Sequence, residues 1–174
     1  MTKHAAAPTD REIRFGEEEI IVSKTDPKGR ITYANDVFIR ISGFSLKELI
    51  GAPHSIVRHP RMPRCVFKLL WDTIEAKREI FAYVMNMAKN GDHYWVFAHA
   101  TPSLDASQNV VGFHSNRRSP DPAQVAKVKG LYDALLNEEQ RFENRKEGMD
   151  SAFAMLTGLL RDKGMEYDEF IFSV

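Results

Sequence analysis

The stretch Lys89-Asn90-Gly91-Asp92-His93-Tyr94-Trp95 decides the fold, because it reads as a tight turn that leads into an aromatic strand. Asn-Gly supplies the positive φ angles that a short hairpin connection needs. The segments on both sides alternate apolar and polar residues, as half-buried antiparallel strands do. The sequence therefore predicts two long strands, over 80–88 and 93–103, that meet at this turn.

Three further strands are predicted outward from this hairpin. Residues 19–25 are rich in β-branched residues and end at Asp26-Pro27-Lys28-Gly29, a turn in which Pro fixes φ and Gly tolerates a left-handed conformation. The chain then resumes as a strand over 31–34, and another strand is predicted over 110–118. Two hairpins and a returning strand give a five-stranded antiparallel sheet.

Short helices are predicted between these strands. Apolar residues recur at helical spacing after Asn35-Asp36, and Ser45 with Glu48 forms a capping-box signature. An amphipathic helix is expected over 66–74. The resulting fold class is α+β, with short helices on one face of the sheet. Such helices leave a cavity above a curved sheet, and a cavity of this kind suits a flat cofactor.

Composition excludes several classes of protein. The chain has 174 residues, of which 43% are hydrophobic, so one domain is expected. Lys plus Arg (24) equals Asp plus Glu (24), which disfavours binding to nucleic acid or to anionic lipid. Cys65 is the single cysteine, no apolar run is long enough to span a membrane, and no signal peptide is visible. A cytoplasmic, soluble protein is expected.

Several blocks of sequence resemble a known family. The blocks 30–36, 41–45 and 48–51 resemble the opening of a PAS sensory domain, and 89–95 resembles its second half. The run Pro53-His54-Ser55-Ile56-Val57-Arg58-His59-Pro60-Arg61-Met62-Pro63 is narrower, because it resembles the FAD-binding PAS domain of aerotaxis and energy-taxis receptors. The resemblance covers roughly residues 20–136 and implies a PAS fold with a flavin site.

The candidate flavin ligands His54, Arg58 and His59 lie in this run. Such donors suit the phosphates or the ribityl chain, and an arginine grips a phosphate through two parallel hydrogen bonds. Taken alone, the residues also fit a helix cap, a packed histidine and a surface arginine. The resemblance implies that the Arg-His pair, Arg58 and His59, holds FAD. Arg61 departs from the family pattern, which commonly has Asp at this position.

Asn86 is the fourth candidate, since the resemblance places an amide near the edge of the isoalloxazine ring. Strand alternation puts Asn86 on the same side as Val84 and Ala88, which favours an inward position over a solvent-facing one. A second departure lies upstream, where the family usually has a Pro-Trp pair and this chain has Glu79 and Ile80. Isoleucine covers a ring by dispersion but offers no π-stacking.

Other chemistries find less support in the sequence. The spacing of His54 and His59 separates them on a helix, and His93 and His99 lie far apart along a strand, so no metal pair is expected. Cys65 has no partner at a spacing that indicates activation. Haem is disfavoured, because the helix after Cys65 carries no histidine. No acid-base pair indicates an enzyme.

The C-terminal part, residues 120–174, is predicted to form helices. Asp121 is a candidate cap, and an apolar register runs from Val125 to Leu160 with an interruption at Gly148. Two helices are favoured over one coiled coil, and they pack either on their own domain or on a second subunit. The tail 165–174 either adds to a sheet edge, docks on a partner or finishes the fold.

These patterns predict three parts: an N-terminal cap over 1–18 that is partly disordered or helical, with Asp10 as the helix cap; a PAS domain over 19–119; and a helical extension over 120–174. The resemblance implies a non-enzymatic sensor that binds FAD and reports redox or oxygen and energy state to a signalling protein such as a chemoreceptor or a histidine kinase. The apolar register from Val125 to Leu160 predicts that this sensor is a homodimer. No output domain is visible after the sheet. The alternative is a cofactor-free PAS module for interaction or dimerisation.

Overall fold

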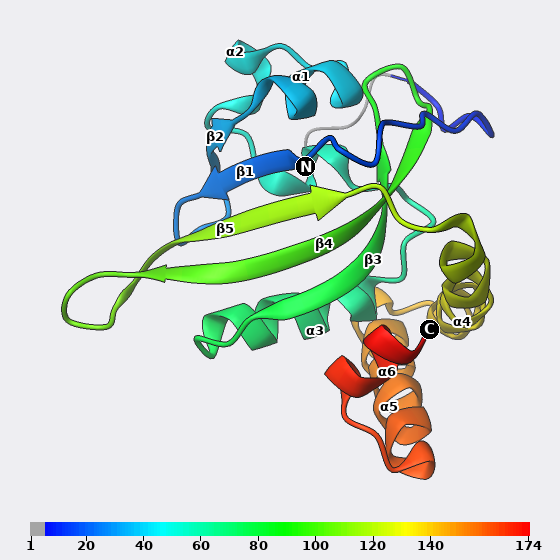
Figure 1. The fold of residues 1–174 in the computed structure, drawn as a ribbon. Helices are drawn as coiled ribbons and strands as arrows, with labels where there is room; N and C mark the ends of the chain where they lie inside the picture. The colour runs from blue at the N-terminus through cyan, green and yellow to red at the C-terminus, as the bar shows by residue number, and fades with distance from the viewer. Residues whose placement is uncertain (1–5) are drawn as a thin grey trace.

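A computed structural model describes residues 6–174 and shows a twisted sheet with helices packed around it (Figure 1). Within these residues, five strands pair antiparallel in the order β2-β1-β5-β4-β3. The strands are β1 (Ile21–Thr25), β2 (Ile31–Ala34), β3 (Ile80–Met87), β4 (His93–Leu104) and β5 (Val110–Arg118). The predicted α+β fold with a five-stranded antiparallel sheet is confirmed.

Four short helical elements connect β2 to β3, and the capping box predicted at Ser45 and Glu48 is present. They are α1 (Asp36–Ser42), α2 (Leu46–Leu49), the 3-10 helix η1 (His54–Val57) and α3 (Arg64–Glu75). Asn35 caps α1 by accepting from the Phe38 N–H, and Ser45 with Glu48 forms the capping box of α2. These elements lie against the inner face of the sheet and leave the space in which the candidate site lies.

The β3–β4 hairpin forms at the predicted turn. Its register pairs Met87 with His93, and Gly91 takes a φ of +94°, the left-handed region that glycine tolerates. A Cβ atom at Gly91 would overlap the carbonyl oxygen of Ala7. Glycine is therefore required here both by the turn and by the N-terminal segment that crosses it.

The N-terminal helix predicted with Asp10 as its cap is not present in residues 6–18. This segment is extended along the start of β4, where the Ile13 N–H donates to the His93 carbonyl at 2.7 Å and the His93 N–H donates to the Arg11 carbonyl at 2.9 Å. Asp92 accepts from the Arg11 side chain. Pairing with an existing strand satisfies the backbone groups that a short isolated helix would leave exposed. The rest of the predicted cap, residues 1–5, lies outside the described residues.

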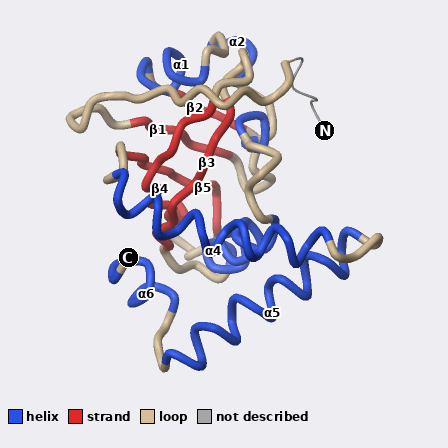
Figure 2. The backbone as a smooth tube through the Cα atoms, turned by 90° about the vertical axis from the view of Figure 1, so that its right-hand side faces the viewer, coloured by secondary structure: helices blue, strands red, loops and turns tan. Residues whose placement is uncertain are grey.

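The C-terminal extension forms α4 (Pro122–Gln140), α5 (Arg145–Lys163) and α6 (Tyr167–Ser173) (Figures 1 and 2). Asp121 caps α4 as predicted. The break between α4 and α5 falls at residues 141–144 instead of Gly148, where a Cβ atom would overlap the Glu139 carbonyl oxygen. Glycine at this position therefore permits the close approach of α5 to the end of α4.

These helices pack on their own domain. Val128, Tyr132, Leu135, Ala152, Leu156 and Ile171 share one core cluster with the residues of the sheet. The Tyr132 hydroxyl donates to the Tyr83 carbonyl on β3, and Phe172 of α6 packs on Phe81 and Phe97. α4 and α6 thus cover the outer face of β3 and β4, while α5 packs against α3. The tail finishes the fold as a helix.

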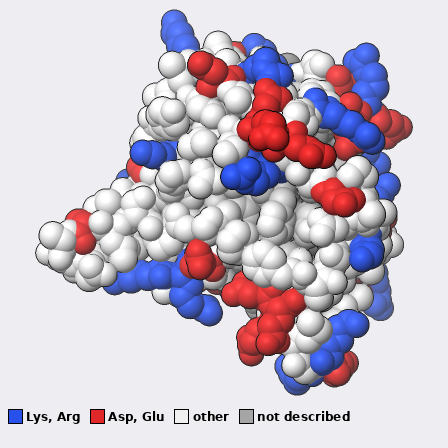
Figure 3. All heavy atoms as spheres, viewed as in Figure 1, with Lys and Arg blue, Asp and Glu red and all other residues white. Residues whose placement is uncertain are grey.

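Charge and hydropathy on the surface agree with the balanced composition. On the face drawn in Figure 3, acidic and basic side chains are interspersed and form no large field of one sign. In the described part of the chain, no helix combines the length and the apolar character needed to cross a bilayer.

Candidate functional site

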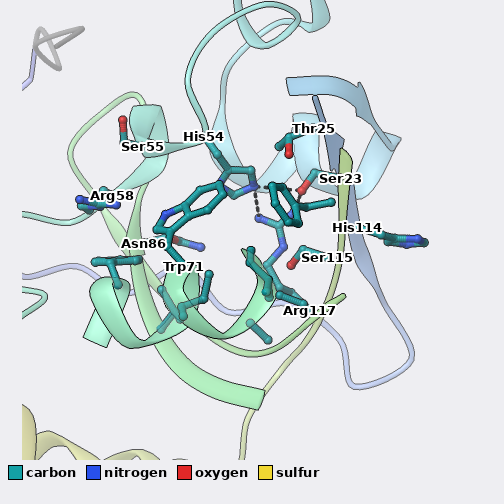
Figure 4. Close-up of a pocket in the computed structure, with 17 residues that line it drawn as sticks. Ser23, Thr25, His54, Ser55, Arg58, Trp71, Asn86, His114, Ser115 and Arg117 are labelled. Carbon is teal, nitrogen blue, oxygen red and sulfur yellow. Dashed lines mark hydrogen bonds between the residues drawn. The ribbon is translucent and has the colours of Figure 1, made fainter. Parts of the chain in front are cut away.

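A cavity of about 90 Å³ lies between the inner face of the sheet and the elements η1 and α3 (Figure 4). Its two sides differ in chemistry. One side is polar and carries Ser23, Thr25, His54, Ser115 and Arg117. The other is apolar and carries Phe67, Leu70, Trp71, Ile74, Val84, Ala98, Ala100 and Phe113. Arg58 and Asn86 also line the cavity.

Strand register builds the polar side, the set that we call the polar wall. Ser23 and Thr25 are two residues apart on β1 and so point to the same face, and Ser115 lies opposite Ser23 on β5. Arg117 follows two residues after Ser115 and shares its face. The Thr25 hydroxyl is buried and has no hydrogen-bond partner within residues 6–174. A buried hydroxyl of this kind is available to a ligand.

Arg117 is the most buried charged side chain at the site. Only 2% of the residue is exposed, and its guanidinium lies 4.5 Å from the centre of the Phe38 ring. It donates to the Ser23 hydroxyl and approaches His54 Nε2 at 3.4 Å. Burial lowers the pKa of Arg117 to about 10, so the side chain stays charged at neutral pH. No Asp or Glu is among the described residues that line the cavity.

His54 completes the polar wall from η1. Its Nε2 lies 2.9 Å from the Ser23 hydroxyl, and its ring stacks on Phe38 with the centroids 6.0 Å apart. Burial, followed by the charges of Arg117 and Arg58, lowers the pKa of His54 to about 3. The ring is therefore neutral, and Nε2 acts as an acceptor toward Arg117. In Figure 4 the side chains of Ser23, His54 and Arg117 point toward one another.

Arg58 and Asn86 lie on a different side of the cavity from Arg117 (Figure 4). The Arg58 guanidinium stacks 3.8 Å from the centre of the Phe67 ring, and burial lowers its pKa. Its Nε is buried and finds no hydrogen-bond partner in the part of the chain that the structure describes. Asn86 is 4% exposed, and its backbone bridges to that of Arg58. The predicted inward position of Asn86 is confirmed.

His59 is buried but does not line the cavity. Its Nδ1 accepts from the Arg61 N–H at 3.1 Å, and its ring lies edge-on to His93 with the centroids 6.2 Å apart. Pro60 follows directly and fixes the chain in a turn. The placement gives His59 a part in shaping the loop after Arg58 and does not bring its ring to the cavity.

The two departures from the family pattern lie away from the cavity. The Arg61 side chain reaches outward to Asp10 at 3.4 Å. Ile80 packs with Ile74, Ala100 and Phe113 in a second core cluster. Neither Arg61 nor Ile80 is among the residues that line the cavity. Ile80 is therefore not placed to cover a ring that is bound in the cavity.

The sequence reasoning missed Trp71 and the members of the polar wall other than His54. Trp71, on α3, brings an indole into the cavity and packs edge-on against Phe113 with the centroids 5.3 Å apart. The signal for Trp71 was the helical stripe that includes Phe67 and Ile74. The signal for Arg117 was strand alternation with Phe113, which places both residues on the inner face.

Redox and metal chemistry of the side chains find no support in the described residues. Cys65 is buried, and burial together with Glu139 raises the pKa of its thiol to about 12. A thiol of this kind stays protonated and unreactive. Within residues 6–174, no group of three or more His, Cys, Asp or Glu side chains is placed to hold a metal ion.

Residues 31–117 match the family model described as the PAS fold. The chain belongs to the PAS family. The matched residues run from the start of β2 to Arg117 in β5 and include every predicted site residue, together with all the residues that line the cavity except Ser23 and Thr25 of β1.

Known proteins of this family include sensors and regulators. The chain is 39% identical over 127 residues to the aerotaxis receptor of Escherichia coli (strain K12), a match that covers 73% of this chain and 25% of the receptor. It is 29% identical over 89 residues to the nitrogen fixation regulatory protein of Klebsiella pneumoniae, covering 51% of this chain and 18% of that protein. The chain thus spans a quarter or less of the length of these relatives.

Solved structures agree on the fold. The dark structure of the blue-light photoreceptor Aureochrome1 LOV superimposes with a TM-score of 0.54 at 23% identity, covering 71% of this chain and 86% of that chain. A light-oxygen-voltage domain studied with a flavin analogue gives a TM-score of 0.57 at 21% identity, covering 70% and 88%.

Proposed function

We propose that this PAS domain is a cytoplasmic, non-enzymatic sensor that binds FAD and reports redox or oxygen and energy state through contacts with a signalling protein. The observation that carries the proposal is a cavity lined by two arginines and no carboxylate, beside an inward amide, in a chain similar to an aerotaxis receptor. Flavin supplies reversible electron transfer when it is bound.

The donor set of the cavity fits this cofactor. Arg58 has a buried, unpartnered Nε and suits the phosphates, because charged donors to phosphate form strong hydrogen bonds. Asn86 can donate to and accept from the edge of the ring, since an amide does both. His54 offers further polar contact from η1. His59 supports the loop that carries Arg58, in place of the direct contact that the resemblance implies.

The size of the cavity sets a condition on binding. Its volume of about 90 Å³ is below the roughly 300–1,000 Å³ that is typical of ligand pockets. The Trp71 indole lies in the cavity and is only partly buried, so a shift of this side chain provides the room. In the proposed complex Trp71 packs on the flavin and supplies the aromatic contact that the residues at Glu79 and Ile80 do not.

A route from the cavity to the surface runs through α3. Its inner side carries Phe67 and Trp71, while the Cys65 N–H at its first turn donates to the Glu139 carboxylate at 2.8 Å. Pro63 provides no side-chain cap, so Glu139 supplies the acceptor that this helix end needs. A movement of Trp71 on binding is expected to reach α4 and α5 and change the surface offered to a partner such as a chemoreceptor or a histidine kinase.

Reconstitution tests the cofactor. Protein incubated with excess FAD and passed through gel filtration is expected to keep a structured flavin spectrum that bleaches on anaerobic reduction. Arg58→Ala is expected to lose the most flavin, because a charged donor to phosphate contributes more than a neutral one. Asn86→Ala is expected to retain some flavin with altered redox behaviour. The exposed Arg118→Ala is the matched control, and colourless wild-type protein refutes the assignment.

The proposed sensor is a homodimer that uses the C-terminal helices, and residues of the N-terminal segment are expected to add to the contact. Met155 and Leu159 on α5 are each 37% exposed although neighbouring residues of this helix are buried, which leaves apolar surface beside the covered side. Light scattering at high micromolar concentration is expected to give twice the monomer mass. A monomer that is unchanged when residues after Asn137 are removed contradicts this assembly.

The second candidate is a cofactor-free PAS module for interaction or dimerisation. The Trp71 side chain favours it, because an indole that already occupies the cavity can act as its permanent filling. Trp71→Ala separates the two functions. Flavin binding that improves in this variant identifies Trp71 as a plug, and weaker binding identifies it as a contact. Binding that fails in both proteins supports the cofactor-free module.

A further inference from the structure

Arg117 is a buried cation that forms no ion pair with a carboxylate among residues 6–174. The titratable and charged side chains that face it or its partner His54 are His54 itself, from η1, Arg58, from the loop after η1, and Tyr94, from β4. The Ser23 hydroxyl and the Phe38 ring also contact its guanidinium. A charge that is removed from water is costly unless it is paired. Neutral hydrogen-bond partners and a ring face compensate for only part of that cost.

One nitrogen of the Arg117 side chain is left without a partner in the described part of the chain. Arg117 Nε is buried and has no hydrogen-bond partner among the described residues, and Arg117 is one of the residues that line the cavity. Three separate elements, β5, β1 and η1, fix the guanidinium in place. A ligand that carries negative charge at this point supplies the missing counter-ion.

We propose that Arg117 makes the cavity bind reduced flavin more tightly than oxidised flavin, an inference that rests on the FAD function proposed above. Reduction of the ring takes two electrons from a reductant, dithionite in the test below, and one proton from water, and leaves one negative charge on the ring. A fixed cation next to the ring stabilises that charge more strongly than it stabilises the neutral, oxidised ring.

Arg58 does not have this role. Its guanidinium stacks on Phe67 at 3.8 Å, away from the polar wall, and in Figure 4 it lies on another side of the cavity from Arg117. The site thus uses its two arginines differently: Arg58 for the phosphates, whose charge does not change on reduction, and Arg117 for the ring, whose charge does.

The test compares affinities for the two redox states in the full chain loaded with FAD. Oxidised affinity comes from fluorescence titration, and the midpoint potential comes from anaerobic dithionite titration with an indicator dye. R117Q is expected to bind oxidised FAD within about threefold of wild type but to lose about tenfold in affinity for reduced FAD, which lowers a two-electron midpoint by about 30 mV. R117K keeps the charge and is expected to stay near the wild-type midpoint. The exposed R118Q is the control.

A second variant tests the same inference if R117Q does not fold. Ser23→Asp places a carboxylate next to Arg117 and neutralises it in position, so its midpoint is expected to fall in the same direction. If Ser23→Asp and R117Q both bind flavin with the wild-type midpoint, the inference about Arg117 is overturned and the flavin function remains. If wild-type protein binds no FAD, both proposals fall together.

Discussion

The two sides of the cavity each combine strands of one sheet with a helical element packed on it, but they differ in how their side chains are satisfied. The apolar wall packs as part of the core, so truncation of its side chains lowers the free energy of unfolding. Its residues are Phe67, Leu70, Trp71, Ile74, Val84, Ala98, Ala100 and Phe113. The polar wall includes a hydroxyl without a partner, a neutral buried histidine and a cation without a counter-ion. Its groups are only partly satisfied by one another.

This contrast indicates which side serves the fold and which serves a ligand. An apolar side chain is satisfied by its neighbours, whereas a buried polar group without a partner lowers stability and persists where it has another use. The apolar wall therefore maintains the cavity, and the polar wall determines what the cavity accepts. Substitutions on the two walls are expected to change stability in different directions.

Ile74→Ala is the largest expected loss. Ile74 is 2% exposed and packs with Ile80, Ala100 and Phe113, so the truncation leaves a void in a packed cluster. The free energy of unfolding is expected to fall by about 2–5 kcal/mol, measured by urea denaturation. Val111→Ala, at a residue that is 52% exposed on β5, is the control and is expected to change stability by less than about 0.5 kcal/mol. Equal losses in both variants contradict a packed apolar wall.

Gly91→Val separates general destabilisation from effects on the site. Gly91 has a φ of +94° in the β3–β4 turn, away from both walls, and a Cβ atom there would overlap the Ala7 carbonyl oxygen. A loss of about 1–3 kcal/mol is expected, with a melting temperature several degrees lower and an unchanged affinity for FAD. Gly130→Ala, on α4 with open space around it, is the control. An unchanged melting temperature shows that the turn tolerates a side chain.

His54 gives the polar wall a dependence on pH. An unfolded histidine titrates near ~6.5, whereas in the folded protein burial and the two arginines lower the pKa of His54 to about 3. The unfolded state thus binds more protons between these values, so stability is lost as pH falls through this range and recovers as pH rises. From pH 7 to pH 5 the expected loss is about 2 kcal/mol. Denaturant titrations at both pH values measure it.

The comparison that isolates His54 uses two variants. His54→Gln is expected to show a smaller loss between pH 7 and pH 5 than wild type, because the titrating ring is gone. His114→Gln, at a histidine that hydrogen-bonds to Asn116 near the surface, is expected to retain the wild-type loss. A wild-type pH dependence in His54→Gln shows that another group is responsible.

Local chemistry explains why much of the fold could be predicted. The hairpin at Asn90-Gly91, the capping box of Ser45 and Glu48, and the cap at Asp121 each depend on residues that are near in sequence. The prediction of an N-terminal helix was wrong because the structure of this segment depends on residues that are distant in sequence. Residues 6–18 pair with the start of β4, which is distant in the chain, and propensity does not report such a partner.

The candidate site was predicted only in part. Strand alternation identified Asn86 as inward, and the 53–63 run identified His54 and Arg58, all of which line the cavity. Arg117 was missed because arginine is rarely fully buried, so residues 116–118 read as a polar strand end. Arg117 can be buried because Ser23 on β1 and His54 on η1 accept hydrogen bonds from its guanidinium. Sequence patterns do not show that β1 and η1 contact this residue.

The smallest expected effect is a gain in stability on the polar wall. Arg117→Met replaces an uncompensated buried cation by an apolar side chain of similar reach beside the Phe38 ring. Ser23 and His54 stay paired with each other at 2.9 Å, so no hydrogen-bond partner is orphaned. Flavin-free protein is expected to gain about 1 kcal/mol, since removal of a buried charge without a counter-ion is often stabilising. For a chain of this length, that gain corresponds to a melting temperature about 2–4 °C higher.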